Sequence, residues 1–161
     1  MSRISKANYY LEIAKTVAMR GTCLRRKFGA IIVKDDVIVS TGYAGAPRGR
    51  VNCCDLNFCL RDKMNIPRGE RYELCRSVHA EANAIIAASR DRMLGATLYL
   101  ACVDPKTGES VGGTCCCQMC KRLVINAGIE KVVVLEDGGN YSVYEVSSWI
   151  EDDDSLGKIG Y

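Results

Sequence analysis

The chain has 161 residues, of which 48% are hydrophobic and 25% are charged. This composition is typical of one globular domain with a substantial core, and it excludes a disordered or low-complexity chain. The formal net charge is +3, from 22 basic and 19 acidic side chains. A strongly basic surface for nucleic acid is therefore not indicated, and nucleic acid is not an expected partner.

The ten cysteines are the unusual feature of this composition. The opening residues MSRISKANYYLEIAK are amphipathic and charged rather than secretory, and no apolar run is long enough to cross a bilayer. We therefore expect a cytoplasmic protein without membrane attachment, in a compartment where disulfides are rare. Clustered cysteines then favour metal binding or catalysis, with buried small hydrophobes as the alternative.

The first half of the chain predicts a helix, a hairpin and a long irregular segment. Ser5 can cap a helix that ends at Gly21. Two apolar runs, FGAIIV at 28–33 and VIVSTG at 37–42, predict a β-hairpin. Residues 43–77 are rich in Gly, Pro, Arg and Cys and have no regular period. An irregular segment of this length needs a site or a metal to order it.

The second half alternates helices and strands. The patterns predict helices at 79–91 and 117–128 and strands at 96–103, 129–136 and 142–148. This alternation implies parallel neighbouring strands with helices on both faces of the sheet. Trp149 is expected to pack on the core from a short terminal helix, and residues 151–154 to form a solvated acidic patch.

A zinc-binding pattern lies at the starts of the two predicted helices. Cys117 and Cys120 are three residues apart, so they lie on one helix face and can share a metal. If His79, the only histidine, meets them at one sheet edge, the three form a zinc site. Three protein ligands leave a fourth position for water, as in catalytic zinc, and Glu81 could move the proton of that water. The alternatives are a redox dithiol and a hydrogen-bonded core histidine.

This combination matches the signature of zinc nucleobase deaminases. The segments FGAIIV, STGYAGAPRG, VNCCD, SVHAEANAI, CQMCKRL and NAGIEKVVV resemble the cytidine and deoxycytidylate deaminase family, most closely its deoxycytidylate branch. The resemblance covers about 5–135 and leaves an insertion at 103–114 and a C-terminal extension at 136–161 within one domain, 1–161. It implies a three-layer α/β/α fold with a central mixed five-stranded sheet.

The resemblance also implies a reaction, the zinc-dependent hydrolytic deamination of dCMP to dUMP and ammonia. Glu81 would protonate N3 of the cytosine and then the departing amine. The backbone N–H of Ala80 would bind the pyrimidine carbonyl, and Arg25 and Arg26 lie where relatives contact phosphate. dCTP or dTTP effectors and a homo-oligomer are expected from the same resemblance.

A second, structural zinc occurs in some relatives. Cys23 and Cys53 match two of its ligand positions, and Cys59 and Cys75 are available for the other two. Four thiolates suit a closed tetrahedral site, which would order the segment 43–77.

Two residues depart from the family pattern. Cys116 stands where the family has Pro, and it could compete as a zinc ligand. Ala44 stands where the family has an Asn that contacts the sugar. The alternatives are therefore a deaminase of another cytosine or purine nucleoside or base, and a non-catalytic zinc module.

Overall fold

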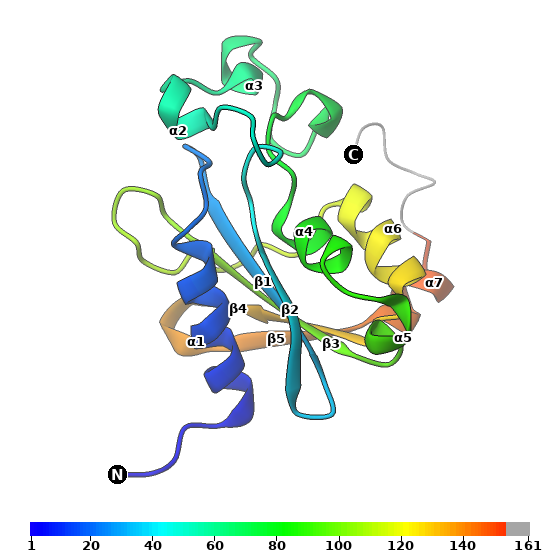
Figure 1. Ribbon diagram of the computed structural model, residues 1–161. Coiled ribbons are helices and arrows are strands. Elements are labelled where there is room, and N and C mark those ends of the chain that lie inside the picture. Colours follow the sequence, from blue (N-terminus) through cyan, green and yellow to red (C-terminus); the bar gives the residue numbers. More distant parts are fainter. Residues whose placement is uncertain (154–161) are drawn as a thin grey trace.

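The middle layer of the fold is a five-stranded sheet in the order β2-β1-β3-β4-β5 (Figure 1). The computed structural model describes residues 1–153, so residues 154–161 of the expected C-terminal extension 136–161 lie outside it. The strands are β1 Lys27–Lys34, β2 Val37–Tyr43, β3 Thr97–Val103, β4 Lys131–Leu135 and β5 Tyr141–Glu145. Only β3 and β4 pair in parallel among these strands. The predicted mixed five-stranded sheet is confirmed.

The predicted hairpin is formed by β1 and β2. Its two-residue turn is Asp35 and Asp36, with φ of 51° and 61°. Asp tolerates this left-handed conformation better than most residues, and two positive φ values give a turn that matches the strand twist. The Tyr10 hydroxyl donates a 2.6 Å hydrogen bond to Asp36 Oδ1 and so ties the turn to the first helix.

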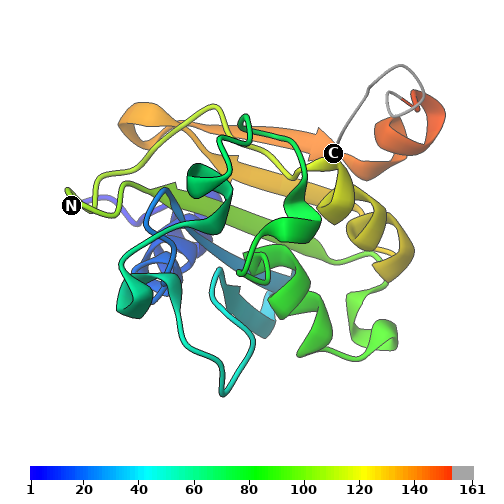
Figure 2. The same cartoon turned by 90° about the horizontal axis from the view of Figure 1, so that it is seen from above.

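Helices cover both faces of the sheet (Figure 2). α1 (Lys6–Ala18) packs on one face, against a core that includes Ile31. The opposite face carries α4 (Ala80–Ile86), α5 (Arg90–Met93), α6 (Gln118–Ala127) and α7 (Val146–Glu151). Alternate residues of a strand point to opposite faces, so Ile32 belongs to this second core. Trp149 of α7 packs against the second core, as predicted.

The single helix predicted at 79–91 is wrong, because α4 and α5 are separate. α4 ends at Ile86, and Ser89 is extended, with φ −79° and ψ 149°, where α5 begins. The Ser89 side chain hydrogen-bonds Asp91. Serine is favoured at the position before a helix and disfavoured inside one, so Ser89 favours a new helix start over continuation.

The parallel arrangement implied for the last strands is also wrong at β5. β4 and β5 pair antiparallel, with Leu135 opposite Tyr141. Only a short connection containing the 3₁₀ turn η2 (Asp137–Gly139) joins them. A parallel return needs a crossover of about a dozen residues or more, so a connection this short permits only a hairpin.

The irregular segment 43–77 contains three short helical turns, α2 (Cys53–Leu56), α3 (Leu60–Lys63) and η1 (Tyr72–Leu74). They lie together at one end of the sheet, above the start of α4 (Figure 1). No helix within residues 1–153 is long and apolar enough to cross a membrane.

The insertion expected at 103–114 is fastened at its far end. The Gly112 N–H donates a 2.9 Å hydrogen bond to Asp137 Oδ1, beyond β4.

Glu151 and its two acidic neighbours are exposed, as expected for a solvated patch, and position 154 lies outside the described residues.

Candidate active site

The starts of α4 and α6 meet on one face of the sheet and bring the three predicted ligands together. His79 is the extended residue immediately before α4, and Cys117 holds the same place before α6. His79 Nδ1 lies 3.5 Å from Cys117 Sγ and 3.4 Å from Cys120 Sγ. The three ligand atoms all lie within 4.8 Å of one another.

These distances fit a zinc ion. Zn–S and Zn–N bonds of about 2.3 and 2.0 Å at tetrahedral angles separate sulfur from nitrogen by roughly 3.5 Å. One imidazole and two thiolates are also ligands that zinc prefers. The donor set is therefore suited in both chemistry and spacing to zinc, with one position left for a water or substrate atom.

The three side chains shift one another's pKa values, and the lowered pKa of Cys117 favours its thiolate form. A hydrogen bond from Cys120 lowers the pKa of Cys117 to about 4, although burial opposes the shift. The same bond and burial raise the pKa of Cys120. Burial lowers the pKa of His79, but hydrogen bonding to Cys117 and Cys75 outweighs it and raises this pKa to about 10. Metal binding must therefore displace protons, as it does at thiolate sites generally.

Glu81 lies in the first turn of α4 and is buried, with 4% of its surface exposed. Burial raises the pKa of its carboxyl group, and the neighbouring His79 charge opposes the shift. Glu81 lines the same cavity as His79 and Cys117. A carboxyl group whose pKa is raised holds a proton more readily, so it can both accept and return one, which suits general acid–base catalysis.

Cys116 does not join the ligand group, which answers the question that the sequence left open. Its side chain is buried in the core on the α4 and α6 face. A hydrogen bond with Cys115, together with burial, raises the pKa of the Cys116 thiol well above its ordinary value, so the thiol stays neutral. In the part of the chain that the structure describes, only His79, Cys117 and Cys120 form a group of three or more residues whose ligand atoms lie this close together.

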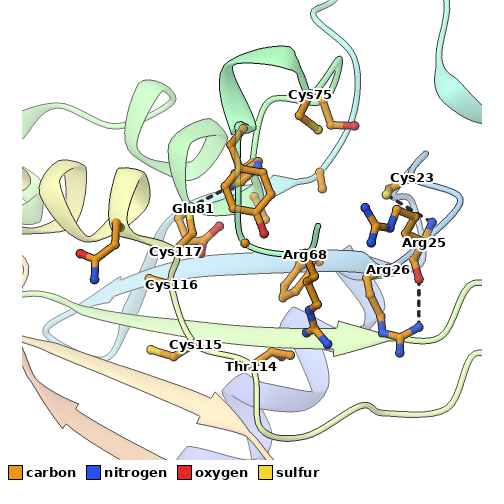
Figure 3. A pocket seen from close by; sticks show the side chains of 18 of the residues that line it. Cys23, Arg25, Arg26, Arg68, Cys75, Glu81, Thr114, Cys115, Cys116 and Cys117 are labelled. Carbon is orange, nitrogen blue, oxygen red and sulfur yellow. Dashed lines mark hydrogen bonds between the residues drawn. The ribbon is translucent and has the colours of Figure 1, made fainter. Parts of the chain in front are cut away.

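The cavity beside this group has a volume of about 670 Å³ and is basic at its other end. Arg25 and Arg26 line it, as do Ala44 and Ala80. In Figure 3, Arg68 is drawn between Cys117 and the two neighbouring arginines.

The three arginines differ in their partners. Arg25 forms a 3.3 Å ion pair with Asp62, and Arg26 a 3.6 Å ion pair with Asp104. Within residues 1–153, no hydrogen bond or ion pair engages the Arg68 guanidinium. Of these three arginines, Arg68 is therefore the most available for an anionic ligand.

The cysteines considered for a second zinc gather nearby but more loosely. Burial and then the charges of Cys23, Cys75 and Cys59 raise the pKa of Cys53, so all four lie near one another. No three of their sulfurs are as close together as the His79 group, among the described residues. Cys75 also hydrogen-bonds His79, and so it lies between the two groups.

Sequence reasoning missed three residues near the site: Arg61, Arg68 and Tyr72. All three line the cavity. They belong to the segment 43–77, which has no period to predict which side chains face inward. The only available signal was the high arginine content of this segment, and that does not identify individual residues.

Comparisons with known proteins agree with this geometry. The family model of the cytidine and deoxycytidylate deaminase zinc-binding region matches residues 4–136. A deoxycytidylate deaminase of Mycobacterium phage D29 is 38% identical over 138 residues, which cover 83% of this chain and 96% of the relative. A deoxycytidylate deaminase of Schizosaccharomyces pombe is 33% identical over 81% of this chain, which spans only 37% of that longer protein.

A solved structure is similar over most of its length. The dCMP deaminase from the cyanophage S-TIM5, in its apo form, superimposes with a TM-score of 0.57 at 25% identity, covering 86% of this chain and 89% of the other. The residues matched by the family model, 4–136, include the starts of α4 and α6, where His79 and Cys117 lie. The chain belongs to the cytidine and deoxycytidylate deaminase family.

Proposed function

We propose that this protein is a zinc-dependent hydrolase that converts dCMP to dUMP and ammonia. The observation that carries the proposal is the close grouping of His79, Cys117 and Cys120 beside the buried Glu81 in one cavity. The deoxycytidylate deaminase of phage D29, matched over nearly its whole length, supports dCMP as the substrate.

The residues have separate roles in this mechanism. His79, Cys117 and Cys120 would hold zinc, which supplies a water of lowered pKa as the nucleophile near neutral pH. Glu81 would accept one proton of that water and deliver it to N3 of the cytosine as the water oxygen bonds to C4. It would then take the remaining hydroxyl proton and pass it to the amine, which leaves C4 as ammonia while the carbonyl forms. Its raised pKa supports this exchange in both directions. The Ala80 N–H, at the start of α4, would donate to the pyrimidine carbonyl.

The basic end of the cavity would hold the 5′-phosphate. Arg25 and Arg26 are candidates from the sequence, and Arg68 joins them because no described residue engages its guanidinium. Arginine binds phosphate oxygens through two parallel hydrogen bonds. Ala44 lines the same cavity with only a methyl group, so sugar recognition must use other groups.

The experiment compares ammonia release from dCMP, CMP and deoxycytidine by zinc-loaded protein, with Glu81→Gln as the inactive control. We expect turnover of dCMP and a large drop for deoxycytidine, which lacks the phosphate. Arg68→Ala should raise KM for dCMP, whereas Arg48→Ala, an exposed arginine outside the cavity lining, should not. Preferred turnover of deoxycytidine would instead favour the alternative, a nucleoside deaminase.

A second, structural zinc at Cys23, Cys53, Cys59 and Cys75 is part of the proposal. The other three thiols lie near enough to Cys53 to contribute to the rise of its pKa, after burial, which supports the site. Native mass spectrometry should give two zinc ions per chain, and one in Cys59→Ser. A single zinc in the unmodified protein would contradict this site.

The assembly and setting of the enzyme are proposed as well. The exposed side chains of Ile86 in α4 and Ile150 in α7 support a homo-oligomer, which sedimentation can test. Regulation by dCTP or dTTP would appear as a shift in the dCMP saturation curve. We place the reaction in the cytoplasm, in the supply of deoxyuridine nucleotides.

A further inference from the structure

Arg61 is one of only two charged side chains that are buried within residues 1–153, and the other is Glu81. Arg61 lies in α3, outside the sheet and its two cores, with 5% of its surface exposed. A buried charge is unfavourable unless other groups compensate it. The contacts of Arg61 therefore indicate what this segment is built to hold.

Those contacts order the chain between α3 and α4. The Arg61 Nη2 donates 2.8 and 2.7 Å hydrogen bonds to the carbonyl oxygens of Pro67 and Glu70. Its guanidinium carbon lies 4.4 Å from the centre of the Tyr72 ring. A guanidinium over an aromatic face is attracted by the ring quadrupole. Arg61 thus fixes both the path of residues 67–70 and the plane of Tyr72.

Tyr72 in turn contacts the histidine of the candidate zinc site. The Tyr72 and His79 ring centres are 4.9 Å apart, with an angle of 83° between the planes. This edge-to-face geometry is preferred by aromatic rings and restricts rotation of the imidazole. Burial raises the pKa of the Tyr72 hydroxyl, so the ring stays neutral beside His79.

We propose that Arg61 and Tyr72 are positioning residues that hold the His79 ring in the orientation that points Nδ1 at Cys117 and Cys120. Arg61 acts through Tyr72, and neither residue is a ligand. A histidine ligand binds a metal well only when groups around it fix its ring, and loss of such groups typically weakens metal binding. The inference rests on the proposed zinc site.

The imidazole NMR signals of this chain can be assigned without ambiguity, because His79 is its only histidine. In untagged protein labelled with nitrogen-15, the imidazole signals come from this one side chain. Chemical shifts of the two ring nitrogens show which one binds zinc. Titration with a competing chelator then gives the zinc affinity of the His79 site alone, whether or not a second zinc is present.

Four variants test the proposal. Tyr72→Phe keeps the ring and should retain one narrow set of zinc-bound signals and the original affinity. Tyr72→Leu removes the ring, and Arg61→Lys removes the guanidinium fork; each should weaken zinc binding at His79 by about tenfold or more and broaden or double the signals. Tyr99→Leu is the matched control, because the Tyr99 ring contacts the Tyr10 ring on the α1 face of the sheet, away from His79. It should lower the urea midpoint without affecting His79.

The outcomes separate this inference from the proposed function. Unchanged zinc affinity and narrow signals in Tyr72→Leu, with bound zinc in the unmodified protein, would overturn the positioning role and leave the deaminase intact. Equal weakening in Tyr72→Leu and Tyr99→Leu would also overturn it, because general loss of stability would then explain the result. Absence of zinc-bound His79 in the unmodified protein would overturn both proposals.

Discussion

Substitution of Gly42 by alanine should damage the active site through one backbone contact. Gly42 lies in β2 beneath α4, and a Cβ there would stand 2.3 Å from Ala84 N and 2.4 Å from Ala80 O. Carbon needs about 3.5 Å from such atoms. Both are backbone atoms of a helix, so no side-chain rotation relieves the clash. α4 must retreat by about 1 Å, at an overpacking cost of about 1–3 kcal/mol.

The retreat would displace the proposed catalytic groups, because α4 carries Glu81 in its first turn and begins directly after His79. Misplacement of reacting groups by about 1 Å can lower a rate by roughly a hundredfold. We therefore expect Gly42→Ala to lose about that factor in kcat for dCMP, measured as ammonia release. The protein should remain folded, with a lowered urea midpoint.

Gly29→Ala is the matched control. Gly29 lies in the neighbouring strand β1 but faces α1, where a Cβ would stand 2.2 Å from Ala14 O and 2.3 Å from Ala18 N. The clash is equally severe, but it pushes on the helix of the opposite face. Both variants should lose similar stability, and only Gly42→Ala should lose activity per folded molecule. Equal activity of the two variants, at equal folded fractions, would refute the argument that α4 contact distance sets the site geometry.

Three further predictions concern stability. Tyr10→Phe should lose about 1 kcal/mol of unfolding free energy at neutral pH because it removes the hydrogen bond to Asp36. That bond and burial raise the pKa of Tyr10 to about 12, so the stabilisation is complete below the ordinary value of 10.0 and is lost as pH rises toward 12. Urea midpoints of both proteins below pH 10 and near pH 12 test this prediction. With zinc removed from both proteins, Glu81→Gln should have a higher free energy of unfolding than the unmodified protein near pH 7. Burial raises the pKa of Glu81, so the stability of the unmodified protein falls as pH rises above the ordinary value of 4.5. Equal slopes of melting temperature against pH for the two proteins, measured by calorimetry, would contradict this. Ser40→Ala removes the buried 2.7 Å hydrogen bond from Ser40 to the Ala84 carbonyl and should cost about 1 kcal/mol of stability. Amide hydrogen exchange in α4 should become faster. Unchanged exchange there would show that the bond does not hold the helix.

The residues that bear the chemistry were predictable because their signals are local. Cys117 and Cys120 are one helical turn apart, and this spacing places two sulfurs on one side of any helix. Glu81 follows His79 by two residues, so whatever orders the histidine also brings the carboxyl group close. The β1–β2 hairpin was predictable for a similar reason, since two apolar runs and a two-residue turn leave few other pairings.

The rest depended on contacts between residues far apart in sequence. The break after Ile86 and the antiparallel edge strand β5 follow from a capping serine and a short connection, which compete with the patterns of helix and strand alternation. The segment 43–77 has no period, so nothing in it indicates that Arg61 turns inward and meets Tyr72.

The sequence by itself therefore determined the candidate ligands, the neighbouring acid and the types of most elements. These properties follow from side-chain chemistry and from spacings of a few residues. Only the tertiary structure decided which cysteines meet, how closely α4 approaches β2, and which arginine lacks a described partner in the cavity. Those outcomes depend on packing two helix starts onto one face of the sheet, a long-range arrangement that no local pattern encodes.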